Sequence, residues 1–164
     1  MPTPHTLKLL HLPTHTVTAH TITVSEALHP VNGNRIWNTQ FSFNEEVIES
    51  KGVYYLYEAI NHIREIVEPK GYRVLARCAD HDAVSTGIQA DMSAGTMVYK
   101  LKEIDAEGRY VSYHVLTESD IQEVVTLEEQ KKNTASYYQS MNNKNNSKPP
   151  KTKQAWWKKL FGIE

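Results

Sequence analysis

The tripeptide Asp80-His81-Asp82 is the part of this sequence whose residue types could most directly do chemistry. Two carboxylates beside an imidazole can hold a metal ion or tune a general base. Ligands at three consecutive positions rarely converge on one ion, however, and no second cluster of His and Glu lies nearby in the sequence. The pattern therefore favours a solvated turn over a catalytic or metal site, and it leaves the three residues as candidates for contact with a partner or ligand.

Histidine and cysteine offer two further sets of reactive side chains. Half of the eight histidines fall within the first 20 residues, at positions 5, 11, 15 and 20. Imidazole is a good ligand for Zn or Ni, but this segment lacks the helical or Cys-containing framework that fixes such ligands. Cys78 lies in a predicted strand beside Val74 and Ala76, which is typical of a small buried hydrophobe rather than of a nucleophile. The sequence predicts no cofactor, no metal and no catalytic residue.

The charge of the chain is divided between a body and a tail. Residues 1–130 contain 10 Lys and Arg against 18 Asp and Glu, a net charge of −8, whereas residues 131–164 contain eight Lys and one Glu, a net charge of +7. Long-range attraction depends on local charge rather than on the total of −1. The division therefore predicts two separate interaction surfaces.

The tail combines a polar linker with an aromatic end. Residues 142–153 contain Asn, Lys and Pro and no large apolar side chain, which predicts a disordered linker. In residues 154–164 a helix would place four apolar side chains on one face beside two lysines: Trp156, Trp157, Leu160 and Phe161 with Lys158 and Lys159. This end could fold back onto its own domain, rest weakly on a membrane surface or dock into a partner protein. The acidic body and the absence of Arg from the tail disfavour nucleic acid.

The first half of the chain predicts a hairpin, a helix and a strand. Residues 16–24 and 35–43 are rich in β-branched and aromatic residues, and Asn32-Gly33 between them is a strong turn signal. Apolar residues recur at helical spacing from Val53 to Val67, and Pro69 ends the helix. Residues 72–79 then form a strand.

The second half predicts a short helix near Thr86–Ser93 with Met92 facing inward, a hairpin of residues 96–104 and 109–116, and a last helix that begins at the capping box Thr126–Glu129. The fold class is accordingly α+β, a single domain with the order ββ-α-β-α-ββ-α, in which an antiparallel or mixed sheet packs against one main helix. Residues 16–141 form the globular domain.

The N-terminal residues 1–15 are predicted to be an arm outside that domain, because Pro2, Pro4 and Pro13 forbid a continuous helix and restrict strand pairing. Their apolar stretch is too short and too interrupted for a secretory signal, and no run of about 18 apolar residues occurs. A single cysteine in 164 residues favours a reducing compartment. The chain is expected to be cytoplasmic.

The segment from Tyr72 to Tyr99 resembles a group of small, mostly uncharacterised bacterial proteins. They share a strand, a turn that ends in Asp, the pattern Ser/Thr-Gly-Met-x-x-Asp-Met-x-x-Gly, and a second strand that ends in Tyr. The matching residues are Ala79, Asp82, Thr86, Gly87, Ile88, Asp91, Met92, Gly95 and Tyr99. Thr86 replaces the usual Ser, and Ile88 replaces Met. The group has no assigned reaction, but some bacterial proteins of this size are immunity or accessory partners of toxins.

Taken together, these observations predict a non-enzymatic bacterial cytoplasmic binding protein of immunity or inhibitor type, whose acidic body meets a basic toxin. Asp80, His81, Asp82, Thr86 and Asp91 are its candidate partner-binding or ligand-binding residues, and residues 156–161 are a second docking segment. Two alternatives remain open: a hydrolytic or nucleotide-processing enzyme that uses the segment from Asp80 to Asp91, and a membrane-peripheral adaptor held by the tail.

Overall fold

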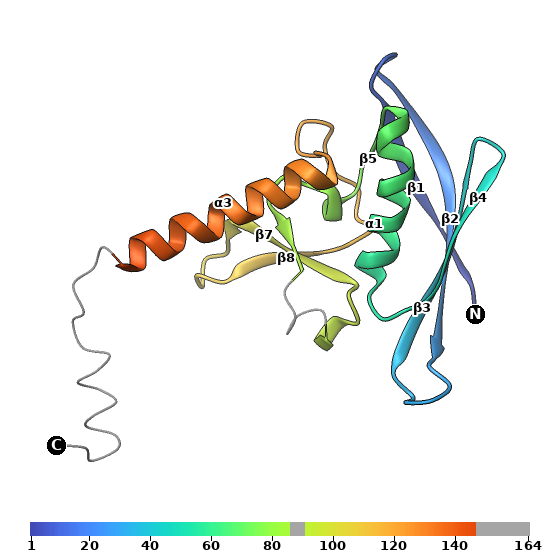
Figure 1. Cartoon of the computed structure of the whole chain (residues 1–164), viewed down its shortest axis with the longest axis horizontal. Coiled ribbons are helices and arrows are strands. Elements are labelled where there is room, and N and C mark those ends of the chain that lie inside the picture. Colours follow the sequence, from blue (N-terminus) through green and yellow to red (C-terminus); the bar gives the residue numbers. More distant parts are fainter. Residues whose placement is uncertain (86–90, 147–164) are drawn as a thin grey trace.

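The computed structural model describes residues 1–85 and 91–146, and it confirms the α+β class (Figure 1). The order of elements differs from the prediction, because four strands rather than two precede the main helix. The elements are β1 (Thr3–His11), β2 (Thr16–Leu28), β3 (Arg35–Phe43), β4 (Glu46–Val53), α1 (Leu56–Val67), η1 (Glu68–Lys70), β5 (Tyr72–Val74), η2 (Arg77–Ala79), β6 (Ala83–Val84), β7 (Met97–Ile104), β8 (Tyr110–His114) and α3 (Leu127–Asn146).

A curled, antiparallel five-stranded sheet packs on one side of α1 (Figure 1). Its strand order is β4-β3-β2-β1-β5. The predicted hairpin is confirmed, since β2 and β3 pair from Ile22 with Phe41 to Leu28 with Arg35. Gly33 lies in the connecting loop at φ 69°, a backbone conformation that glycine adopts without the steric cost of a side chain.

Two strands of this sheet were missed by the sequence analysis. Residues 1–15 are not an arm, because β1 lies between β2 and β5 and buries Leu7 and Leu9. Pro4 is tolerated because β5 pairs only with residues 9–11 of β1, so the proline end of the strand has β2 as its single partner among the described strands. β4 was not predicted because its charged residues interrupt the apolar pattern of a strand. As an edge strand it can carry these charges on its open face.

A second, three-stranded sheet follows, in the order β6-β7-β8. Its β7–β8 pair confirms the second predicted hairpin. The last helix begins as expected, because the Thr126 hydroxyl accepts the Glu129 N–H at 3.0 Å and the Glu129 carboxylate accepts the Thr126 N–H at 2.8 Å. The linker prediction was wrong in its first residues, since α3 continues to Asn146 (Figure 1).

Both sheets share one hydrophobic core. The predicted apolar stripe is confirmed from Leu56 onward, because Leu56, Ile60, Ile63 and Val67 are all buried on α1, whereas Val53, its first predicted residue, ends β4. Burying such a side chain contributes about 1.5–3 kcal/mol relative to exposure, so this stripe is a major part of what holds α1 in place. Within residues 1–85 and 91–146, no helix combines the length and the apolar composition that a bilayer crossing requires.

Candidate functional site

A buried lysine, Lys100 on β7, lies at the centre of the segment that the sequence singled out. Its residue is 2% exposed. Its Nζ atom lies 3.0 Å from a carboxylate oxygen of Asp80, 3.0 Å from one of Glu123 and 3.1 Å from one of Asp82. Glu103 adds a fourth carboxylate at 3.5 Å. One ammonium therefore lies among four carboxylates that come from three parts of the sequence.

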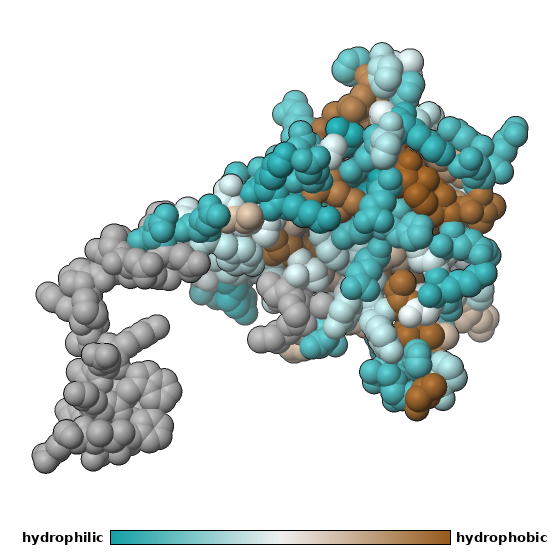
Figure 2. All heavy atoms as spheres, viewed as in Figure 1, coloured by the Kyte–Doolittle hydropathy of each residue, from teal (hydrophilic) through white to brown (hydrophobic). Residues whose placement is uncertain are grey.

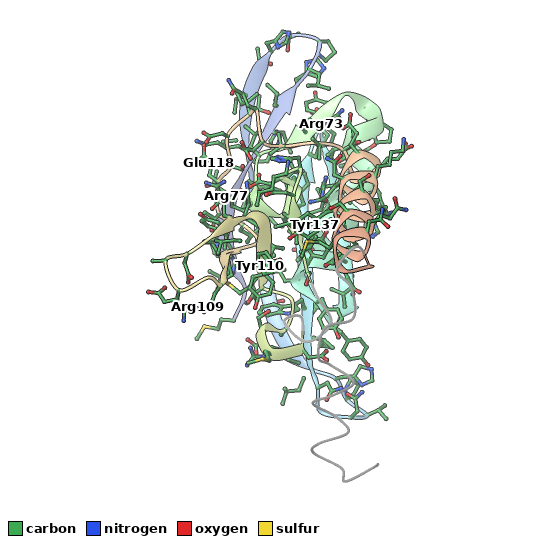
Figure 3. All side chains as sticks on the ribbon, turned by 90° about the vertical axis from the view of Figure 1, so that its left-hand side faces the viewer. Arg73, Arg77, Arg109, Tyr110, Glu118 and Tyr137 are labelled. Carbon is green, nitrogen blue, oxygen red and sulfur yellow. The ribbon has the colours of Figure 1, made fainter. Side chains whose placement is uncertain are left out.

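Asp80 is fully buried, so the prediction of a solvated turn is wrong at this residue. Its side chain accepts hydrogen bonds from the Ser119 hydroxyl and from the Arg77 guanidinium at 3.2 Å, in addition to the contact with Lys100. Arg77 comes from η2, and its position is marked in Figure 3. Both carboxylate oxygens are thus engaged by groups of the same chain.

Asp82 is also buried, at 4% exposure, whereas His81 beside it is partly exposed. One carboxylate oxygen of Asp82 accepts the Lys102 N–H at 3.1 Å. The ring of His81 lies between two charged groups, with Nε2 3.2 Å from the Lys102 ammonium and Nδ1 3.3 Å from the Glu123 carboxylate. Because the ammonium can only donate, Nε2 is the acceptor and the ring proton belongs on Nδ1, facing Glu123.

The charges of this cluster stabilise one another. Burial lowers the pKa of Lys100, but its hydrogen bonds with Glu123, Asp80 and Asp82 outweigh that effect and raise the pKa well above its ordinary value. The hydrogen bond with Lys100 lowers the pKa of Glu123. A carboxyl whose pKa is lowered by folding contributes stability above its unfolded pKa, and that contribution is lost as the pH falls through the folded value.

His81, Asp82 and Glu123 are also the one group of side chains in the described residues whose ligand atoms lie close enough, within 4.8 Å, to share a metal ion. The Lys100 ammonium already occupies the cation position between two of them, at 3.0 Å from Glu123 and 3.1 Å from Asp82. A divalent ion at that point would meet the repulsion of a buried positive charge. The arrangement is that of an internal ion-pair cluster.

Asp91, the acid that no core role explained in the sequence, accepts a hydrogen bond from the Tyr55 hydroxyl at 2.5 Å. It lies at the start of residues 91–95, which cover the N-terminus of α1. The carbonyl oxygens of Ala94 and Gly95 accept the Leu56 N–H at 3.3 Å and the Tyr57 N–H at 2.9 Å. These contacts satisfy backbone donors that the first turn of a helix leaves unpaired. Asp91 therefore anchors a backbone cap.

Met92, in the same segment, is 86% exposed, so the prediction that it faces inward is wrong. The inward contacts of this segment come instead from Ala94, which packs against the core, and from the backbone. The Ala94 carbonyl also accepts the indole N–H of Trp37 at 2.7 Å. Thr86, Gly87 and Ile88 lie outside the described residues, as does the docking segment from Trp156 to Phe161.

Arg64 on α1 is a second buried charge, 0% exposed, which the sequence pattern did not indicate. Its guanidinium donates to Glu68 at 2.8 Å, to the Gln130 side chain at 2.7 Å and to the Val125 carbonyl at 2.8 Å. Gln130 in turn donates to the carbonyls of Cys78, Asp80 and Ala83. The available signal was the position of Arg64 four residues after the buried Ile60. This network attaches α3 to α1 and η2.

Cys78 is buried, and burial raises the pKa of its thiol to about 12. The thiolate is the reactive form of cysteine, so the native protein should not react with a disulfide reagent at pH 8. We expect one thiol to be released in denaturant and almost none in the folded state, measured by the absorbance of the thionitrobenzoate product. Rapid labelling of the folded protein would contradict the placement of Cys78 in the core.

The surface of the body is strongly acidic. Among the described residues the buried ionic groups are two cations, Arg64 and Lys100, and two carboxylates, those of Asp80 and Asp82. All eight surplus negative charges of residues 1–130 therefore lie outside the core. Hydrophilic residues cover much of α1 and α3 on the face shown in Figure 2.

Two of the exposed carboxylates, Glu58 and Glu65, lie one above the other on the outward face of α1. Neither has an ion-pair partner within the described part of the chain, whereas the exposed Glu107 and Glu128 pair with Arg109 and Lys132. Unpaired carboxylates keep their full charge available to a partner.

A comparison of the chain with protein-family models and with curated proteins finds no match.

Proposed function

We propose that this chain is a non-enzymatic binding protein that presents an acidic surface to a basic protein partner, as a bacterial immunity or inhibitor protein does. The observation that carries the proposal is the location of the charge. Eight surplus negative charges lie outside the core, and the two buried carboxylates, Asp80 and Asp82, are balanced by Lys100 and Arg64. A surface of one sign accelerates the encounter with a partner of the opposite sign and repels others.

The internal contacts of the Asp80–Asp82 segment support binding over catalysis. A general acid or base needs a proton-transfer path to a substrate. Both carboxylate oxygens of Asp80 instead bind side chains of the same chain, those of Ser119, Arg77 and Lys100. Asp80 is also fully buried from solvent. His81 is the partly exposed member of the segment, and its two nitrogens face Lys102 and Glu123. This region accordingly serves as a rigid support for the surface.

The outward face of α1 is the part of that surface that we assign to the partner. Glu58 and Glu65 are unpaired among the described residues, and they stand on a helix that is fixed by a fully buried stripe on its other side. Asp91 lies near the start of the same helix, because it accepts a hydrogen bond from Tyr55, which directly precedes α1. A rigid helix with free carboxylates loses little entropy on binding Lys or Arg side chains.

The test is capture of the partner from cells that express the chain naturally, with three full-length forms at low salt: the natural sequence, Glu58→Gln/Glu65→Gln, and the control Glu107→Gln/Glu128→Gln. Both pairs change the net charge by two and concern exposed side chains, so each should leave the stability within about 0.5 kcal/mol. We expect the α1 pair to lose most of the partner and the control to retain it, as quantified by mass spectrometry.

If the natural sequence and the α1 pair capture equal amounts of the same basic protein, the α1 surface is not the binding site. If the protein captured by all three forms is acidic or neutral, the electrostatic proposal itself is wrong.

A further inference from the structure

A patch of tyrosines lies where α3 crosses the β7–β8 hairpin, and we call it the tyrosine face. It consists of Tyr99 on β7, Tyr110 on β8, and Tyr137 and Tyr138 on α3. The hydroxyls of Tyr110 and Tyr137 lie 2.9 Å apart, and the rings of Tyr99 and Tyr110 lie 6.3 Å apart between centroids. Figure 3 labels Tyr110 and Tyr137 on the side of the molecule toward which α3 extends.

This face is open and partly apolar. Tyr110 is 39% exposed and Tyr138 is 46% exposed. Ile104, which pairs with Tyr110 across the hairpin, and Met141, one turn after Tyr137, are exposed as well. A cavity of about 330 Å³ adjoins the face between β7 and α3, and Leu101 and Tyr137 line it together with five polar residues: His81, Asp82, Lys102, Asn133 and Ser136. Exposed aromatic and apolar side chains gathered beside a cavity mark a binding surface.

The end of α3 lies within reach of this face. The helix passes the hairpin at Tyr137 and ends nine residues later at Asn146, about 14 Å farther along its axis. Nine residues lie between Asn146 and Trp156, so the ten Cα–Cα steps from one to the other span at most about 33 Å. The segment from Trp156 to Phe161 can therefore return to the tyrosine face of its own chain.

Charge and composition favour the same occupant. Residues 147–164 contain five lysines and one acid, whereas the surface of the body is acidic. Their four large side chains, Trp156, Trp157, Leu160 and Phe161, match a tyrosine surface in chemistry. A tethered segment also acts at an effective concentration in the millimolar range, which a separate partner rarely reaches.

We propose that the segment from Trp156 to Phe161 docks onto the tyrosine face of the same chain. Its indoles pack on the rings of Tyr110 and Tyr138. A membrane or another protein that uses this segment must first displace it from the body. The interaction is independent of the α1 surface assigned to the basic partner.

The experiment measures the distance from a spin label near the end of the chain to the amides of the body. Cys78 is buried, so a nitroxide attached to Ile163→Cys labels that position selectively. In dilute full-length protein we expect the amide signals of Tyr99, Tyr110 and Tyr138 to lose most of their intensity, while those of α1 and β4 keep theirs. Even intensities throughout the body, or losses centred on α1, would overturn the proposal.

Two pairs of variants identify the contacts. In the labelled protein, Trp156→Ser/Trp157→Ser should restore the signals of the tyrosine face, whereas Lys148→Ser/Lys151→Ser should leave them weakened. Tyr138→Ser should lower the ratio of docked to free tail about tenfold, as removal of a central aromatic contact does. Tyr54→Ser, which removes a side chain of similar exposure, 41%, outside the face, should not change it. Equal effects within either pair would contradict the assigned contacts.

A mixture separates docking within one chain from docking between copies. Isotope-enriched protein without a label is mixed with labelled protein of natural isotope content. The enriched signals should keep their intensity, because the tail reaches only its own body. Loss of intensity in this mixture would overturn the proposal in favour of a dimer.

Discussion

Replacing Gly95 with Ala is expected to destabilise the protein by about 2–5 kcal/mol, the sum of a left-handed backbone strain and a steric overlap. Gly95 has a φ of +68°, and a Cβ atom there would lie 2.4 Å from Cβ and 2.6 Å from Cα of Tyr55. Neither atom can yield cheaply, because they belong to the backbone region that starts α1. The cap formed by Ala94 and Gly95 would have to separate from the helix.

Gly52 provides a matched control, because its φ is also +68° but nothing lies within 4 Å of the position of its missing Cβ. Gly52→Ala should therefore cost only the backbone strain, about 1–2 kcal/mol. The measurement is the free energy of unfolding in urea for both variants. Equal losses would show that the contact between the cap and Tyr55 does not exist in solution.

Replacing Asp80 with Ala should lower the free energy of unfolding by about 3–5 kcal/mol. The substitution removes the partner that the buried Lys100 ammonium and the Ser119 hydroxyl share. A domain of this size is stable by about 5–15 kcal/mol, so the variant should unfold at a much lower urea concentration. Asp120→Asn, an exposed acid in the connection that follows Ser119, should stay within about 0.5 kcal/mol of the natural sequence.

This pair of variants also separates the two interpretations of the Asp80–Asp82 segment. Removing a structural carboxylate destabilises the protein. Removing a strained catalytic carboxylate often leaves the protein as stable as before or makes it more stable. An unchanged urea midpoint for Asp80→Ala would contradict the role of the Lys100 cluster as internal support and would return the segment to the list of candidate catalytic groups.

Local patterns predicted the elements that have strong local signals. The α1 stripe, the β2–β3 and β7–β8 pairs and the Thr126–Glu129 cap each depend on residues within one or two turns or strands, and each is present. β1 was not predicted because its prolines disfavour a strand that is paired on both sides. β5, its second neighbour in the sheet, pairs only with residues 9–11 and so avoids Pro4. That fact depends on the packing of β5, which is distant in the sequence.

In the candidate site, too, residues with local sequence signals were identified and residues that depend on distant contacts were not. The sequence identified Asp80, His81, Asp82 and Asp91 as unusual, and all four make specific contacts. It could not show that Lys100, 20 residues later, would lie between the carboxylates, because nothing local marks a lysine in a strand as buried. Arg64 was missed for the same reason, since its partners Gln130 and Val125 lie more than 60 residues away.

The claim that the acidic surface recruits a basic partner is tested most directly by the salt dependence of the association rate constant. Once the partner has been captured, the rate constant is measured by stopped flow for the natural sequence at ionic strengths from 20 to 500 mM, about the range over which screening becomes strong. We predict a steep fall with salt, and a shallower one for Glu58→Gln/Glu65→Gln than for Glu107→Gln/Glu128→Gln. A rate constant that does not change with ionic strength would contradict the account.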